Sequence, residues 1–419
     1  MSSKTDVLTK GAILTGSRGR GIPDSDYESS NILNEVVSLV KDNAASYMMY
    51  FALIVIMLVF QVWTEGKFFT AQNISNLFNQ AAYVAVLAIG MTIILILRHI
   101  DLSCGYVAGL SGAVAAILME KMGMNVWMSM FIVLAMGLAI GLYQGALVTK
   151  IGIPAFITTL AGMFIFRGLL TRSLAGTGTI IVTDPTFKAM CQGFIPDFPN
   201  NNTGVHIVTM IIAVIAVVIF NAFKIRSRMN REKYGFPVAS LPIFIAGKVV
   251  VSAVILFAAW MLAINKGIPI SACIVAVILG AYAFMLSKTK LGRHIYGIGG
   301  NDQAAELSGV DVKKVTMFAF CSMSVLAAIA GFLYTSRLSS ATPTAGLAFE
   351  MDAIASSYIG GTAVSGGVGK VTNAIIGTFV IMSLTNGMNL MSIDISYQYI
   401  VKGIIFIIAV AFDVKSKKK

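Results

Sequence analysis

The sequence predicts an all-α polytopic membrane protein with about 10–12 transmembrane helices. Hydrophobic residues make up 57% of the 419 positions and charged residues only 12%, whereas soluble domains carry about a quarter charged residues. The mean hydropathy is +0.82. The apolar residues also gather in runs of about 20, the length that a helix needs to cross the hydrocarbon core. So few charges cannot cover a water-facing surface, which excludes a soluble domain.

Five candidate spans lie in the first part of the chain. The first has to serve as its own insertion signal, because residues 1–44 are polar and contain no apolar core of a signal peptide. The third and fourth contain small residues at helical spacing, which permit close packing of helices. The five spans are 45–63, 77–98, 101–119, 126–149 and 154–171. The small residues are Gly105, Ala108, Gly109, Gly112 and Ala116, followed by Gly137, Gly141 and Gly145.

Seven further candidate spans follow a polar segment, 171–206, which is either a mouth on one face or a connector. Its Pro and Asn residues favour turns. Lys402 lies inside the last span, where a charge costs about 2.5–3.5 kcal/mol, so we expect it to pair inside the bundle or to reach an interface. The spans are 206–223, 247–264, 268–286, 315–336, 353–368, 371–391 and 397–414. Of these, 353–368 and 371–391 are Gly-rich and closely spaced, so one is a candidate re-entrant segment.

Lys and Arg residues predict the orientation, because they collect in cytoplasmic loops. They are concentrated in a loop at 224–246, in a loop at 288–314 and in the tail 415–419. Twelve spans place all three on one side, so we expect cytoplasmic N- and C-termini. The predicted domains are a polar cytoplasmic tail (1–44), a membrane domain (45–414) and a basic cytoplasmic tail (415–419).

Residues for catalysis or metal binding do not form a pattern in this sequence. The histidines are His99, His206 and His294, each near the edge of a span, where a lone histidine is usually structural. The four cysteines include no CxxC pair. The net charge of +12 falls in the gaps between apolar runs, which indicates membrane orientation rather than nucleic-acid binding. We therefore expect no catalytic residues, no metal site and no cofactor.

The segment 366–370 has the composition of a phosphate-binding loop but not its spacing. A P-loop needs a Gly, four residues, and then Gly-Lys followed by Ser or Thr. Val364 stands where the first Gly is required, and Val371 stands where the hydroxyl is required. If ATP drives this protein, another chain binds it.

The segment 288–314 contains the most informative of the predicted cytoplasmic sequences. Gly297, Gly299 and Gly300 permit a sharp turn. Asn301 is then expected to cap a short helix through Glu306, which Gly309 ends. A short helix held parallel to the membrane is a feature that a cytoplasmic motor could grip, and a solvated loop is the simpler alternative. The residues expected to carry coupling are Gly297, Gly299, Gly300, Asn301, Gln303, Ala304, Ala305, Glu306, Ser308 and Gly309.

Several motifs resemble the permeases of bacterial ribose/xylose/galactose-type ABC importers. Gln303-Ala304-Ala305 followed by Gly309 is similar to the EAA-type loop of ABC importer permeases, and the stretch 291–310 resembles the sugar permeases as a whole. The resemblance runs from about residue 46 to the C-terminus. Further motifs that carry it are 68–73, Ile100-Asp101-Leu102-Ser103, 153–160, 339–346, 350–355 and Asn386-Gly387.

The resemblance implies a non-catalytic permease of the bacterial inner membrane, built from two copies. It also implies that a separate ABC ATPase supplies ATP hydrolysis and that a periplasmic binding protein delivers the sugar. The chain departs from the pattern at Arg98-His99 and Cys104. The extra helix pair, 206–223 and 247–264, makes it resemble the longer xylose-type permeases, so a pentose is the first expectation and a hexose the second.

Polar residues inside the spans are candidates for the pathway or its mouth. Asp101 either caps a helix or takes part in transport, and Glu350 and Asp352 either cap a helix or line the mouth. Asn, Gln and Tyr residues in the spans either bind hydroxyl groups or join helices by hydrogen bonds. The candidates for the pathway are Asp101, Ser103, Glu350, Asp352, Asn386 and Asn389; other polar positions are Asn76, Asn79, Gln80, Tyr83 and Gln144.

Three alternative functions remain open from the sequence. An ion-coupled secondary transporter would place acidic residues within the spans, and these spans are nearly empty of them. A signalling receptor or membrane scaffold would bind a ligand without transporting it. The third alternative is an ABC permease for another sugar, a nucleoside or an autoinducer.

Overall fold

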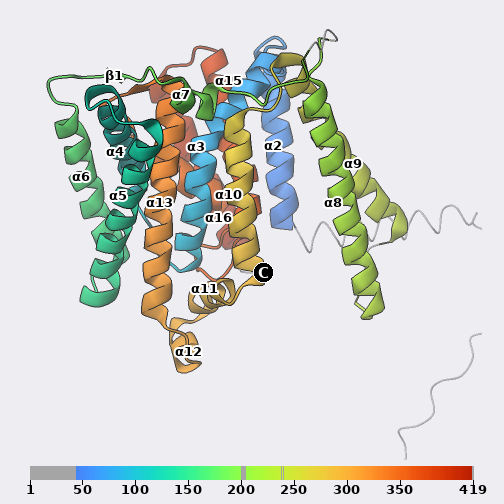
Figure 1. The fold of residues 1–419 in the computed structure, drawn as a ribbon. Coiled ribbons are helices and arrows are strands. Elements are labelled where there is room, and N and C mark those ends of the chain that lie inside the picture. Colours follow the sequence, from blue (N-terminus) through green and yellow to red (C-terminus); the bar gives the residue numbers. More distant parts are fainter. Residues whose placement is uncertain (1–43, 200–203, 237, 239, 418–419) are drawn as a thin grey trace, which may run out of the picture.

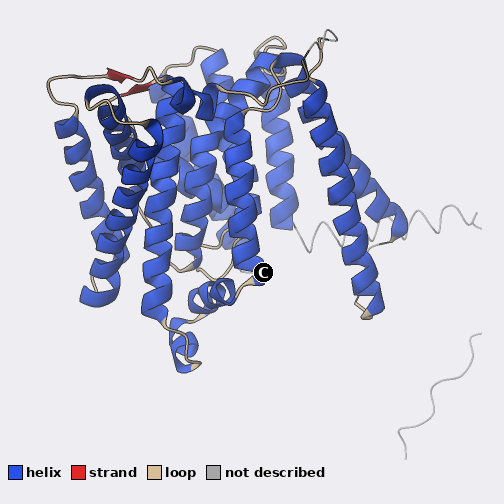
Figure 2. Ribbon diagram, in the orientation of Figure 1, coloured by secondary structure: helices blue, strands red, loops and turns tan. Residues whose placement is uncertain are grey.

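The computed structural model describes residues 44–199, 204–236, 238 and 240–417, and helices dominate it (Figures 1 and 2). The described residues form one small sheet, in which β1 (Ile180–Ile181) pairs antiparallel with β2 (Ser340–Ala341) at one end of the bundle. The predicted all-α fold is confirmed. Residues 1–43 of the predicted polar tail and residues 418–419 lie outside the described residues.

Helix α3 (Ala71–Ile96) forms the centre of the bundle. Its residues are apolar on nearly all sides and are buried along most of its length, as expected for a helix surrounded by others. It contacts α13, α14, α15, α9 and α10, while α13 also packs against α4 and α5. The helices that contact α3 or α13 are α4 (Cys104–Ala116), α5 (Val126–Ala146), α9 (Leu241–Asn265), α10 (Ile270–Lys288), α13 (Val312–Leu338), α14 (Phe349–Ile359) and α15 (Val371–Leu390). The short π-helices η1 (Ile117–Lys121) and η2 (Leu147–Ile151) continue α4 and α5.

The peripheral helices expose large apolar side chains, because lipid solvates such side chains as well as a protein core does. Eight helices of the described chain are long and apolar enough to cross a membrane, fewer than the 10–12 that the sequence predicts, and apolar helical stretches at Met49–Trp63 and Ile395–Ile408 are shorter. The peripheral helices are α2 (Ala44–Trp63), α6 (Ala155–Ser173), α8 (Ile207–Lys233), α9 (Leu241–Asn265), α10 (Ile270–Lys288) and α16 (Ile395–Lys417).

The predicted span at 353–368 is wrong as a full crossing. Its helix, α14, has 11 residues, or about 16 Å at 1.5 Å per residue, and turns follow it. The segment 342–348 before α14 is not helical and lies against α4, where a Cβ atom on Gly105 or Gly109 would overlap the carbonyl oxygens of Gly346 and Ala345. Irregular backbone is tolerated within a membrane protein where other parts of the protein cover it. The small residues of α4 therefore make room for a half-helix.

The extra pair, α8 and α9, packs together at one side of the bundle (Figure 1). Helix α8 continues to Lys233, so most of the basic residues assigned to a loop at 224–246 are helical. The predicted loop is too long, because the basic residues continue the helix and do not mark its end. Lys and Arg are good helix formers, and they continue α8 beyond its apolar part.

Candidate coupling site and translocation pathway

Two short helices, α11 (Lys290–Gly300) and α12 (Asp302–Leu307), project from the end of the bundle opposite α7 (Pro185–Gln192) and β1 (Figure 1). The Asn301 side chain accepts a hydrogen bond from the Ala304 amide at 2.9 Å, which confirms the predicted cap. Gly309 has φ +83° and follows the end of α12, as expected. We call the two ends of the bundle the α12 side and the α7 side.

The predicted turn at Gly297, Gly299 and Gly300 is wrong. All three residues lie within α11, and the chain changes direction at Asn301, whose backbone is extended (φ −156°, ψ 108°). Of the three, only Gly299 serves close packing: it is buried, and a Cβ atom there would overlap the Ile96 carbonyl oxygen.

Helix α12 presents a small exposed surface. Of its six residues only Ala305 is buried, and the apolar side chain of Leu307 is 90% exposed. After Gly309, Asp311 caps α13 by accepting a hydrogen bond from the Lys314 amide, which lowers the pKa of its carboxyl group. The Asn301 cap at its start and the Gly309 turn after its end hold α12 as a distinct unit beyond the bundle. The predicted coupling residues Asn301, Gln303, Ala304, Glu306 and Ser308 are all exposed on it.

Arg98 joins three segments that are far apart in the sequence. Its Nε donates to the Ser365 carbonyl oxygen at 2.9 Å, and its Nη2 donates to the Gly300 carbonyl oxygen. The Gly367 amide donates to Ile96 O at 2.9 Å, and the Tyr296 hydroxyl donates to Gly369 O at 2.7 Å. We call this set the clasp; it comprises 96–98, Tyr296, 299–300 and 365–369.

The clasp was missed by the sequence analysis. Arg98 was noticed only as a departure from a family pattern, and 366–370 only as a failed phosphate loop. Arg98 has φ +64°, an uncommon conformation for a residue with a side chain, and no sequence pattern marked it. The clasp connects α11 with the end of α3 and with the loop that follows the half-helix α14.

Asp101 and Ser103 organise the start of α4. One carboxylate oxygen of Asp101 accepts hydrogen bonds from the Ser103 amide at 2.8 Å and from the Ser103 hydroxyl at 2.7 Å. The Gln144 side chain donates to Ser103 Oγ at 2.7 Å. Asp101 therefore holds the turn at Ser103, the N-cap residue of α4, and its other oxygen, Oδ2, is buried without a partner among the described residues.

The start of the half-helix α14 brings two more predicted residues into the interior. Asp352 accepts two hydrogen bonds from Lys402 of α16, at 2.9 and 3.0 Å, which confirms that Lys402 pairs inside the bundle. Glu350 is buried, and its Oε2 has no partner in the described chain. A Cβ atom on Gly105 would overlap that oxygen. Glu350 therefore approaches α4 at Gly105, which is four residues after Asp101 in the chain.

Asn386 and Asn389 join helices and lie apart from this group. Asn386 exchanges two side-chain hydrogen bonds with Asn73, at 2.8 and 3.0 Å. The Gln398 side chain donates to Asn389 Oδ1 at 2.8 Å. The structure thus favours the helix-joining interpretation for these two residues.

Asn386→Leu is expected to lower the free energy of unfolding by about 1–3 kcal/mol, because it removes both hydrogen bonds to the buried Asn73 side chain and leaves that side chain only its bond to Phe68 O. Asn389→Leu is the matched control: the Asn389 side chain is exposed, so its loss should cost much less. Heating the detergent-solubilised chain and following its monodisperse fraction measures both. Equal stability of the two variants would contradict the interpretation.

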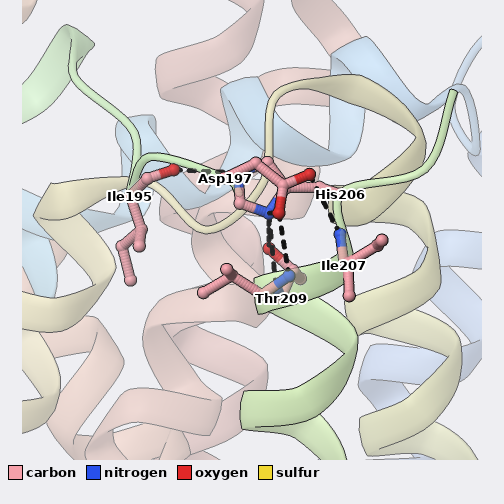
Figure 3. Close-up of polar contacts among 6 residues, drawn as sticks. Ile195, Asp197, His206, Ile207 and Thr209 are labelled. Carbon is pink, nitrogen blue, oxygen red and sulfur yellow. Dashed lines mark hydrogen bonds and ion pairs between the residues drawn. The ribbon is translucent and has the colours of Figure 1, made fainter. Parts of the chain in front are cut away.

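His206 is a structural residue of the α7 side, as expected for a boundary histidine (Figure 3). Its Nδ1 accepts from the Thr209 amide at 3.3 Å and caps α8, and its Nε2 lies 2.9 Å from Ile195 O. Asp197 accepts from the amides of Ile207 and Val208 at 3.1 and 3.0 Å. This cluster attaches the loop before α8 to the first turn of that helix.

Known proteins that are similar in sequence are transport permeases. Residues 73–410 match the family described as the permease component of branched-chain amino acid transport systems. The chain is 37% identical over 377 residues to the xylose transport system permease protein XylH of Escherichia coli K12, covering 90% of this chain and 93% of XylH. It is 38% identical to XylH of Haemophilus influenzae, covering 90% and 98%. It is 31% identical over 351 residues to the ribose import permease protein RbsC of E. coli K12, covering 84% and 88%. No solved structure matches.

Proposed function

Because the chain belongs to the permease family of bacterial carbohydrate-uptake ABC transporters, we propose that it is the membrane subunit of a pentose importer, with D-xylose as the first candidate. The observation that supports this proposal is the 37% identity to a xylose permease over 90% of the chain. The family makes the chain a multi-pass membrane protein and a non-catalytic subunit. Membership in this family does not fit the two alternatives that the sequence left open, an ion-coupled secondary transporter and a signalling receptor.

The energy for transport comes from a partner in this proposal. The family implies an ABC ATPase and a sugar-binding protein, and the exposed α12 is the surface that the ATPase would contact. Lys and Arg residues gather at the end of α8 and around α11 and α12, so the positive-inside rule puts the α12 side in the cytoplasm. The α7 side then faces the binding protein. A second copy of the chain would complete the pathway.

The clasp gives the ATPase a mechanical route into the bundle. A shift of α11 pulls on Arg98 and Ile96 at the end of α3 and on 365–369 after α14. Asp101 follows Arg98 in the chain, and Glu350 lies at the start of α14, beside Gly105 of α4. Each has one carboxylate oxygen without a partner in the part of the chain that the structure describes. Carboxylate oxygens accept hydrogen bonds from sugar hydroxyl groups. Movements of α11 would then expose and cover the carboxylate oxygens of Asp101 and Glu350 in turn.

Reconstitution tests the proposal. The chain is assembled with its ABC ATPase and its sugar-binding protein in proteoliposomes, and uptake of D-xylose, D-ribose and D-galactose is compared. We expect ATP-dependent uptake with D-xylose preferred, and no ATP hydrolysis by the purified chain alone. Preferred uptake of D-ribose or D-galactose would show that the substrate is that sugar and not D-xylose. Hydrolysis by the chain alone, or uptake driven by an ion gradient without ATP, would refute the assignment.

A further inference from the structure

A cavity of about 210 Å³ opens on the α7 side of the bundle. This volume far exceeds the ~10–15 Å³ that one water needs, so the cavity has room for a small solute. One wall is a face of the first turns of α3, and the opposite wall comes from the end of α7 and the turn between α9 and α10. Polar residues on these walls are Gln72, Ser75, Asn76, Asn79, Gln192 and Asn265.

The walls of the cavity are held in place by backbone hydrogen bonds. The Ile195 amide donates to Ile268 O, and the Ile270 amide donates to Gly193 O, each at 3.0 Å. Gly267 packs against the His206 ring, where a Cβ atom would overlap it. The His206 cluster of Figure 3 thereby supports the turn that carries Asn265. Across the cavity, Ser271 donates to Asn79 Oδ1 at 2.6 Å. The cavity is therefore preformed.

Ser75 is the second, independent sign of a ligand. Its side chain is 2% exposed and lines the cavity, and its hydroxyl group has no hydrogen-bond partner among the described residues. Buried polar groups are nearly always paired. A group that enters the cavity can supply the partner that the Ser75 hydroxyl lacks among the described residues.

The lining matches a polyhydroxylated ligand. Amide side chains both donate and accept hydrogen bonds, as sugar hydroxyl groups do. The cavity also has an apolar surface in Phe194, with the Lys266 ammonium 5.8 Å from its ring centre. Among the described residues that line the cavity none is acidic, so the lining shows no preference for a cation.

We propose that this cavity is a monosaccharide subsite on the α7 side, where sugar is held before it enters the pathway. The proposal rests on the proposed function, which supplies the sugar and places this side outside. It also assigns a role to the extra helix pair, because α9 and the turn after it provide Asn265 and Lys266. In this subsite, Ser75 and Asn76 recognise the hydroxyl groups of the sugar.

Protection from thiol labelling tests the subsite in the membrane complex of the full chain with its ABC ATPase, in nanodiscs. Gln72→Cys places a reactive thiol in the cavity, and Thr186→Cys is a matched control on α7, exposed but outside the cavity. The four native cysteines are buried or half-buried. We expect D-xylose, added without the binding protein, to slow maleimide labelling of Gln72→Cys and to leave Thr186→Cys unchanged. D-ribose and D-galactose are run in parallel.

A second substitution separates recognition from mere exclusion. Adding Ser75→Ala to Gln72→Cys should raise the sugar concentration for half-protection by about tenfold, the effect of losing one hydrogen bond. Protection by none of the three sugars overturns the subsite. Protection that appears only with the binding protein also overturns it and shows that a polypeptide docks there. Uptake by the same complex in proteoliposomes is measured separately: uptake without protection refutes only the subsite, whereas no uptake of any sugar refutes the proposed function.

Discussion

Gly299→Ala is expected to reduce ATP-driven sugar uptake by about tenfold or more, whereas Gly297→Ala and Gly300→Ala should leave it near the parent value. The three glycines lie within four residues of one helix, but their surroundings differ. A Cβ atom at Gly299 would overlap the backbone at Ile96 and Gly367. At Gly297 and Gly300 it would meet nothing within 4 Å.

The physical reason is that the neighbours of Gly299 are backbone atoms, which cannot rotate away as a side chain can. The added methyl group would separate α11 from the end of α3 and break the hydrogen bond between Gly367 N and Ile96 O. We expect this to cost about 1–3 kcal/mol, as overpacking does elsewhere, and to disconnect α12 from the bundle. Ala at the two exposed positions should instead strengthen the helix by roughly 0.5–1 kcal/mol.

Uptake, ATP hydrolysis and complex assembly are measured together for the three variants. The expected pattern for Gly299→Ala is an assembled complex that hydrolyses ATP but imports little sugar. Arg98→Ala should give the same pattern, because it removes two hydrogen bonds of the clasp. Normal import by both variants would show that the clasp does not transmit the movement.

Lys402→Met is expected to destabilise the protein by about 3–5 kcal/mol, the usual cost of removing one partner of a buried ion pair. The side chains of Lys402 and Asp352 are only 19% and 12% exposed. Without the ammonium group, Asp352 at the start of α14 loses the only cation that pairs with it among the described residues. The double variant Asp352→Asn with Lys402→Met should recover most of the loss, because it removes both charges.

The measurement is thermal unfolding in detergent, with Lys248→Met as control. Lys248 lies near a helix end on α9 and contacts the Phe244 ring at 5.1 Å, so its loss should cost much less. If the double variant is as unstable as the single one, the instability comes from lost packing of the Lys402 side chain and not from the unpaired charge.

Local features of the structure were predictable from sequence. The apolar runs located α3, α5, α13 and the other long helices, because a lipid-spanning helix requires a fixed length of apolar residues. The Asn301 cap and the helix end before Gly309 depend on residues within a few positions of each other, and both predictions are confirmed. Lys402 was expected to find a partner, since an unpaired charge in a span is costly, but the sequence did not identify Asp352.

Contacts between distant segments were not predictable. Arg98 is 202 residues from Gly300 and 267 from Ser365, and no periodicity or spacing relates them. The half-helix α14 was mistaken for a span, because an apolar segment gives the same pattern whether it crosses the bilayer or stops midway. The glycines of α11 were assigned to a turn, because glycine serves turns and close packing equally well.

The sequence by itself determined that this chain lies in a membrane, where most of its long helices run, and where the short helix after Asn301 begins and ends. These follow from hydrophobicity and from backbone capping, which depend on neighbours along the chain. Only the tertiary structure decided which carboxylate pairs with Lys402, how α11 reaches α3 and α14, and that Ser75 faces an amide-lined cavity. These features arise where helices remote in sequence approach closely, and that approach depends on the shape of all the surfaces together.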